Sequence, residues 1–170
     1  MGFEKLGQFN ACVNPDQTRI QQLYAIGAAS LAESREQLHG LPPVNFVTLL
    51  IANFDALDNG ELGHWTKGLI DAGSRYFCAW GNRCDLAHEI FDEECSMFES
   101  DEESVIMTTD HRDDSIDDAI WFALNCAVPA PPYDRNWNAI LAVSIDDAES
   151  LDRLRAVFAE PTQFCEQHDT

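Results

Sequence analysis

Residues 44–53 read VNFVTLLIAN, an almost unbroken apolar run that contains several β-branched residues and follows Pro42 and Pro43. Such a run is typical of a strand that is buried on both faces, as the strands of parallel sheets are. Both faces have to be covered by other elements, and in an α/β protein those elements are helices. The stretch therefore predicts a three-layer α/β/α domain built around this strand.

Three further units of strand and helix follow along the chain. Strands are predicted at 76–80, 105–109 and 139–145 from their apolar and β-branched content. After each of the four strands, a residue that can cap a helix precedes apolar residues at helical spacing; these caps are Asp58, Asn82, Ser115 and Asp146. The alternation predicts right-handed crossovers and a four-stranded, mainly parallel sheet with helices on both faces. The expected strand order is 2-1-3-4.

The residues before the first strand predict an additional N-terminal helix over residues 14–40. Asn14 can cap this helix, Pro15 suits its first position, and Gly40 ends it. Its apolar face consists of residues at helical spacing, namely Ile20, Leu23, Tyr24, Ala28 and Leu31. We expect this helix to cover the sheet face that the later helices leave open.

The chain is expected to form a single α/β domain over residues 1–170. Within it, residues 44–160 hold the four β-α units, Pro161 ends the last helix, and residues 162–170 form a polar tail. A chain of this length can bury a substantial core, since roughly two-thirds of the unfolded surface is hidden in a domain of about 150 residues. A hydrophobic content of 45% supplies that core and argues against intrinsic disorder.

The charge of the chain is strongly acidic. Lys and Arg together number 10 and Asp and Glu 30, which gives a net charge of −20 and a pI of about 4.2. This balance disfavours binding to nucleic acid and to anionic membrane surfaces, because both need clustered basic residues. Solubility, or adaptation to high salt, is an alternative explanation of the same acidity.

The expected compartment is the cytoplasm. Residues 1–10 lack the basic start and apolar run of a secretory signal, and no apolar stretch approaches the ~20 residues of a transmembrane helix. The six cysteines are scattered and form no Cys-x-x-Cys pair, so we expect free thiols.

Two acidic stretches flank the predicted third strand and suggest a protein-binding surface. The candidate contact residues are Glu99, Glu102 and Glu103 before the strand and Asp113, Asp114, Asp117 and Asp118 after it, with Trp121 as an aromatic anchor. Acidic faces steer and hold basic proteins, and aromatic anchors dominate many interfaces. An ordinary solvated helix face is the alternative explanation. We predict a small, non-catalytic binding or regulatory protein, inhibitor-like or immunity-like, that recognises a basic partner without a cofactor.

An alternative hypothesis places a small enzyme or ligand-binding site at the ends of the strands. With the order 2-1-3-4, the strand order reverses between the first and third strands, where ligands bind in such sheets. Asp55 follows the first of these strands, and Asp110 and His111 follow the third. The two carboxylates can hold Mg²⁺, and His111 can act as a general acid or base near neutral pH.

A weaker metal hypothesis concerns zinc. Cys84 and His88 are four residues apart on a predicted helix and would share one of its faces. Their spacing matches no compact zinc module, and pairing of His88 with Asp92 one turn further on is the alternative explanation.

Overall fold

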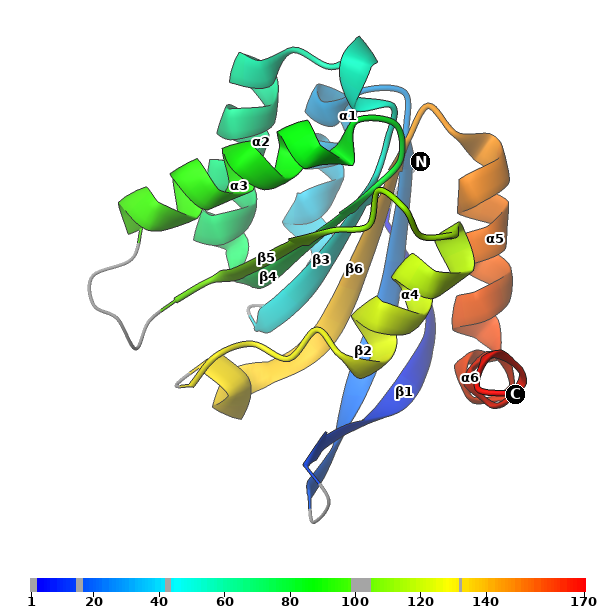
Figure 1. The fold of residues 1–170 in the computed structure, drawn as a ribbon. Helices are drawn as coiled ribbons and strands as arrows, with labels where there is room; N and C mark the ends of the chain where they lie inside the picture. The colour runs from blue at the N-terminus through cyan, green and yellow to red at the C-terminus, as the bar shows by residue number, and fades with distance from the viewer. Residues whose placement is uncertain (1–2, 15–16, 42–43, 99–104, 132) are drawn as a thin grey trace.

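The computed structural model describes residues 3–14, 17–41, 44–98, 105–131 and 133–170. Within these residues the chain forms a six-stranded, mostly parallel sheet with helices on both faces (Figure 1). The strand order is β1-β2-β6-β3-β4-β5, and β1 is antiparallel to β2 while the other neighbours are parallel. The predicted α/β class is confirmed.

Strand and helix alternate from the second strand onward. In chain order the elements are β1 (Glu4–Asn14), β2 (Gln17–Ala28), α1 (Leu31–Gln37), η1 (Leu38–Gly40), β3 (Asn45–Ile51), η2 (Phe54–Ala56), α2 (Asn59–Ala72), β4 (Ser74–Trp80), α3 (Cys84–Phe98), β5 (Met107–Asp110), α4 (Ile116–Asn125), η3 (Tyr133–Asn136), β6 (Trp137–Ile145), α5 (Ala148–Ala159) and α6 (Pro161–His168). None of the helices formed by the described residues has the length and apolar content needed to cross a bilayer.

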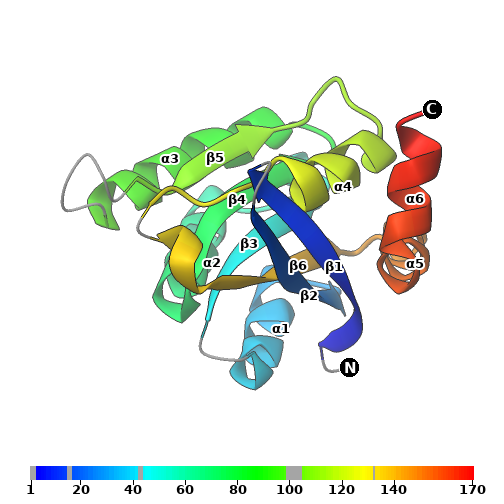
Figure 2. The same ribbon diagram turned by 90° about the horizontal axis from the view of Figure 1, so that it is seen from below.

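The sheet separates two hydrophobic cores. Helices α1, α2 and α3 cover one face, and α4, α5 and α6 cover the other (Figures 1 and 2). On β3, Phe46 and Leu50 pack into the first core, whereas Val47 and Leu49 pack into the second. All four side chains are at most 1% exposed. The double burial predicted for this strand is therefore present, and it accounts for the three layers.

The N-terminal helix predicted over residues 14–40 is wrong. The structure forms the antiparallel pair β1 and β2 there, and only α1 is helical before the short η1. Ile20, which the prediction placed on an apolar helix face, is 53% exposed. Pro15, the expected first helical residue, lies outside the described residues.

The reason for this error lies in the apolar run of β2. Leu23 packs into the core below α4, α5 and α6, while Tyr24 and Ile26 pack into the opposite core. A short apolar run fits a helix and a doubly buried strand equally well by periodicity. The run forms a strand because it pairs with β6, and β6 is distant in the sequence.

The predicted number and order of strands are also wrong. In the numbering of the four predicted strands, the observed order is 3-2-1-4, because β4 separates β3 from β5 and β6 lies on the other side of β3. Burial explains the difference. Strand β5 has only four residues, and Met107 is 42% exposed, so β5 suits an edge. In β6, all residues from Ala139 to Ile145 are buried, so β6 suits the centre.

The polar tail predicted over residues 162–170 contains a helix. Pro161 occupies the first turn of α6 rather than only ending α5, since a fixed φ and a missing N–H suit the first helical position. Phe164 and Cys165 are each 8% exposed and pack into the core shared with α4 and α5. The apolar spacing Pro161, Phe164, Cys165 is the sequence signal for this helix.

The loops that leave β3 and β4 are joined by backbone hydrogen bonds. The N–H of Ala52 donates to Trp80 O at 3.2 Å, and the N–H of Phe54 donates to Asn82 O at 2.9 Å. Between them, Gly81 has a φ of 126°, and a Cβ at this position would lie 2.0 Å from Ala52 O. Glycine is required here both by the conformation and by the close approach of the two chains.

We expect Gly81→Ala to lower the free energy of unfolding by about 3 kcal/mol, because alanine adds backbone strain and a clash with Ala52 O. Gly68→Ala is the matched control. Gly68 lies inside α2, where a Cβ would meet Arg35 at an ordinary contact distance of 3.5 Å, so alanine should raise stability by about 0.5–1 kcal/mol. Urea unfolding of both variants measures these changes. Equal stabilities would contradict the close approach at Gly81.

Candidate functional site

The carboxyl ends of the parallel strands lie together at one edge of the sheet, at the top in Figure 1. We call this the carboxyl edge. The chain leaves β3 for α2 on one face and leaves β6 for α5 on the other. In doubly wound sheets, ligands bind in the crevice opened by such diverging connections. This point lies between β3 and β6, not between the predicted first and third strands.

A cavity of about 300 Å³ lies at this point, between the loops that follow β3 and β6. Its walls include Asn53, Leu57, Asp146 and Asp147. A second cavity of about 410 Å³ shares the two aspartates and adds Glu33. Taken together, the described lining residues of the two cavities include three carboxylates and no lysine or arginine. The crevice therefore suits a cationic group better than a phosphate or a carboxylate.

The two aspartates after β6 have different environments. Asp147 caps α5, since its carboxylate accepts hydrogen bonds from Ser150 N at 2.9 Å and Ser150 Oγ at 2.6 Å. The helix cap predicted at Asp146 is thus one residue further on. Asp146 has a φ of 51°, a conformation that aspartate tolerates better than most residues. Its exposed carboxylate has no hydrogen-bond partner among the described residues.

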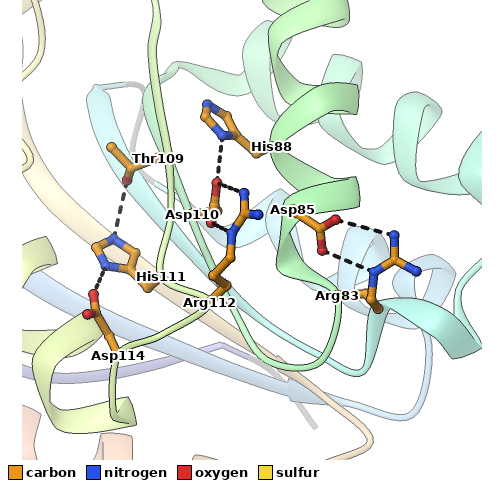
Figure 3. Close-up of polar contacts among 8 residues, drawn as sticks. All are labelled: Arg83, Asp85, His88, Thr109, Asp110, His111, Arg112 and Asp114. Carbon is orange, nitrogen blue, oxygen red and sulfur yellow. Dashed lines mark hydrogen bonds and ion pairs between the residues drawn. The ribbon is translucent and has the colours of Figure 1, made fainter.

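Asp55 belongs to a polar network between the ends of β3 and β4. The Asn82 amide donates to Asn53 Oδ1 at 3.1 Å and to Asp55 Oδ2 at 2.9 Å. Arg83 lies 3.8 Å from Asp55 and donates two hydrogen bonds to Asp85, at 3.2 and 3.3 Å (Figure 3). These contacts stabilise the paired loops around Gly81.

Asp110, at the end of β5, is held by the side chains of Arg112 and His88 (Figure 3). Arg112 donates to both of its carboxylate oxygens, at 2.9 and 3.2 Å, and His88 Nδ1 lies 2.8 Å from Oδ2. The Arg112 hydrogen bond, followed by that of His88, lowers the pKa of Asp110 to about 2, against the opposing effect of burial. The carboxylate is 11% exposed and stays ionised at neutral pH.

His111 points away from Asp110. Its Nδ1 lies 2.7 Å from Asp114 Oδ2, its Nε2 lies 3.3 Å from Thr109 Oγ1, and its ring packs against Phe122 of α4 (Figure 3). The side chain is 5% exposed. His111 therefore packs between the sheet and α4, whereas Asp110 faces α3.

The strand-end site predicted from Asp55, Asp110 and His111 is not assembled by this fold. Strand β4 lies between β3, which Asp55 follows in η2, and β5, which carries Asp110. The two carboxylates also contact different arginines. Adjacent residues of a strand point to opposite faces, which explains why His111 does not accompany Asp110. The expected magnesium ligands Asp55 and Asp110 thus belong to two separate polar clusters.

The predicted zinc ligands Cys84 and His88 also have separate environments. Cys84 is fully buried in the core below α1, α2 and α3, and burial is the main cause that raises the pKa of its thiol. His88 contacts Asp110 at 2.8 Å and Asp92 at 3.5 Å. Across the described parts of the chain, no three His, Cys, Asp or Glu side chains are grouped in a way that could hold a metal ion.

The acidic residues predicted to bind a partner lie at the start of α4, on the carboxyl edge. We call the group Asp113, Asp114, Asp117 and Asp118 the α4 acidic patch. Ser115 and Asp118 form a reciprocal capping box, which confirms the predicted cap. Asp117 pairs with Arg153 through hydrogen bonds of 2.8 and 2.9 Å, and His168 lies 3.0 Å from Asp118.

The two remaining predicted elements of this surface have different outcomes. Trp121 is partly buried and stacks on His168, with ring centroids 5.8 Å apart. Glu99, Glu102 and Glu103 lie outside the described residues.

Sequence reasoning missed the grouping of Glu33 with Asp146 and Asp147. No local motif marks this grouping, and only the correct strand order would have predicted it. Because β2, β6 and β3 are neighbours in the sheet, the loops that leave them lie together. Glu33 itself accepts a hydrogen bond from Ala29 N at 2.7 Å and marks the start of α1.

These features define a three-layer α/β domain with an acidic crevice at its topological switch point. The chain belongs to the family described as a domain of unknown function (DUF7684), whose family model matches residues 27–161. The match runs from the end of β2 to the first residue of α6 and includes the loops of the carboxyl edge. Comparisons with curated proteins and with solved structures gave no match.

We expect Asp110→Asn to lower the free energy of unfolding by about 1 kcal/mol at neutral pH, since the exposed Arg112 is partly screened by solvent. The pKa of Asp110 is about 2 in the folded protein and about 3.9 when unfolded. The contribution is therefore fully present above about pH 4 and is lost as the pH falls toward 2.

Urea unfolding of the wild type and of Asp110→Asn at about pH 7 and about pH 2.5 measures this difference. The two proteins should converge in stability at the lower pH. Asp113→Asn is the control, because Asp113 is exposed and forms no hydrogen bond or ion pair within the described residues. A stability difference that is independent of pH would contradict the assignment.

Proposed function

We propose that this protein is a non-catalytic binding protein whose carboxyl edge recognises a basic protein partner. The observation that carries the proposal is the exposure of the α4 acidic patch. The side chains of Asp114, Asp117 and Asp118 are 45%, 37% and 49% exposed, and Asp113 is also exposed. A surface of this kind attracts cationic side chains over several ångströms and guides their approach.

The internal ion pairs of the patch are compatible with partner binding. Asp117 pairs with Arg153 and Asp118 with His168, but both pairs are exposed to solvent. Exposed pairs contribute only about 0–1 kcal/mol each. A lysine or arginine of a partner can therefore share or replace these contacts at little cost.

The acidic surface continues along the carboxyl edge toward the crevice between β3 and β6. Asp146 is exposed there, Asp147 lines both cavities, and Glu33 lines the larger one. The two arginines of this edge, Arg83 and Arg112, each pair with aspartates. The edge thus offers carboxylates at two separated places, which fits an extended basic segment better than a single cation.

Trp121 supplies an aromatic contact next to the patch. Its ring is partly exposed and stacks on His168, which also contacts Asp118. Tryptophans beside charged rims are common anchors of protein interfaces. The strand-end enzyme, by contrast, receives no support from the geometry, because Asp110 and His111 face opposite sides of the sheet.

A fluorescent peptide rich in lysine and arginine tests the proposal by anisotropy. Its affinity should fall at least tenfold between about 50 and about 300 mM NaCl, because salt shortens the range of the attraction. Asp113→Asn combined with Asp117→Asn should weaken binding about three- to tenfold, and neither residue caps a helix.

The matched control is Glu93→Gln combined with Glu166→Gln. Both glutamates are exposed, and the pair removes the same charge from α3 and α6 rather than from the patch. Losses of equal size in the two double variants would assign binding to net charge alone. Absence of peptide binding at low salt would overturn the proposal.

A further inference from the structure

The opposite edge of the sheet, at the amino ends of β3, β4 and β6, has a different character. We call it the amino edge; it is the lower end of the sheet in Figure 1. A cavity of about 630 Å³ lies there, between the start of β2, the loops before β3 and β4, and the start of β6. This volume is within the range of small-molecule sites.

The charge of this cavity is opposite to that of the molecule. Arg19 and Arg135 line it, and none of its described lining residues is an Asp or a Glu. The protein as a whole carries a net charge of −20. An arginine pair free of carboxylates is therefore unexpected here on composition alone.

Most of the other arginines in the described residues are ion-paired or hydrogen-bonded. Ion pairs with carboxylates are formed by Arg83, Arg112, Arg153 and Arg155. Arg75, also near the amino edge, donates to the carbonyls of Ile70 and Ser74 and lies over two aromatic rings. Arg19, Arg35 and Arg135 form no ion pair with any residue that the structure describes, and of these three only Arg19 and Arg135 line the cavity.

Two buried donors at the cavity lack an acceptor. Arg19 Nη1 and Trp137 Nε1 are inaccessible to solvent and have no hydrogen-bond partner among the described residues. Both residues line the cavity, and Trp137 is 1% exposed. Buried donors without an acceptor are costly, and most buried polar groups in proteins are paired. A bound acceptor can pair with either atom only after a small movement of the cavity wall, because solvent does not reach these two atoms in this structure.

The remaining polar walls are amides. Asn45, Asn136 and Asn138 line the cavity, and Asn45 Nδ2 donates to Tyr133 O at 3.2 Å. Asparagine side chains carry both donors and acceptors and suit the hydroxyl groups of a small polar molecule. Guanidinium groups match the paired oxygens of carboxylates and phosphates.

We propose that the cavity at the amino edge binds a small organic oxyanion, a phosphate ester or a polycarboxylate, between Arg19 and Arg135. The net charge of the protein favours a small ligand over a nucleic acid, since acidic surfaces repel a long polyanion. The site lies at the far end of the sheet from the carboxyl edge, so the two ends would bind ligands of opposite charge.

Calorimetric titration of the full chain with ribose 5-phosphate and with citrate tests this site. Each probe is compared with sodium chloride of equal ionic strength, because salt alone relieves repulsion within an acidic protein. Saturable binding of either probe supports the proposal, and the probe that binds identifies the anion as a phosphate ester or a carboxylate. Failure of both probes to bind overturns it.

Arg135→Gln tests the position of the site. Arg135 is exposed and forms no ion pair within the described residues, so its replacement should not unfold the protein. Loss of a charged hydrogen-bonding partner should raise the Kd about tenfold to a hundredfold. Arg19→Gln should have a similar effect, whereas Arg35→Gln, on α1 and outside the cavity, should have none. Equal Kd values for the wild type and Arg135→Gln would overturn the proposal, whatever the probe.

Discussion

The burial of β3 and β6 on both faces is the constraint on which the remaining structure depends. Leu49 and Leu50 of β3, like Ile140 and Leu141 of β6, are adjacent in the chain and pack into opposite cores. Strands of this kind require helices on both faces, so the connections between the parallel strands run over a face of the sheet through a helix. The crossovers make the strands parallel, and parallel strands collect their exit loops at a single edge. The carboxyl edge is thus a consequence of the apolar pattern.

The position of the acidic residues follows from the same constraint. In a parallel sheet the crossover helices begin near the carboxyl ends of the strands, and helix N-termini favour carboxylates. Asp58, Asp118 and Asp147 satisfy backbone donors at the starts of α2, α4 and α5. Capping places these carboxylates on one edge, but it does not require the additional exposed Asp113 and Asp146, which take no part in these caps. Those two residues distinguish a charged surface from a set of helix caps.

The sequence predicted those parts of the fold that are determined locally. The strand over 44–53 and the caps at Asp58 and Ser115 were found because double burial and capping each leave a short signal. Strand β2 was missed because its run from Leu23 to Ile26 fits two periodicities, and its partner β6 is more than a hundred residues away. The strand order failed for the same reason: it depends on which strands are central, and relative burial is a property of the whole sheet.

The candidate site likewise combines features that the local sequence determines with features that depend on the whole sheet. Asp110 and His111 were both identified correctly as polar residues at a strand end, yet the alternation of side chains sends one to α3 and the other to α4. Asp146 and Glu33, far apart in sequence, line one cavity because β2 and β6 are neighbours. The amino edge was overlooked because its arginines are isolated in the sequence, at positions 19 and 135, and form no motif. Their charge became informative only after the fold had brought both arginines to one cavity that has no Asp or Glu among its described lining residues.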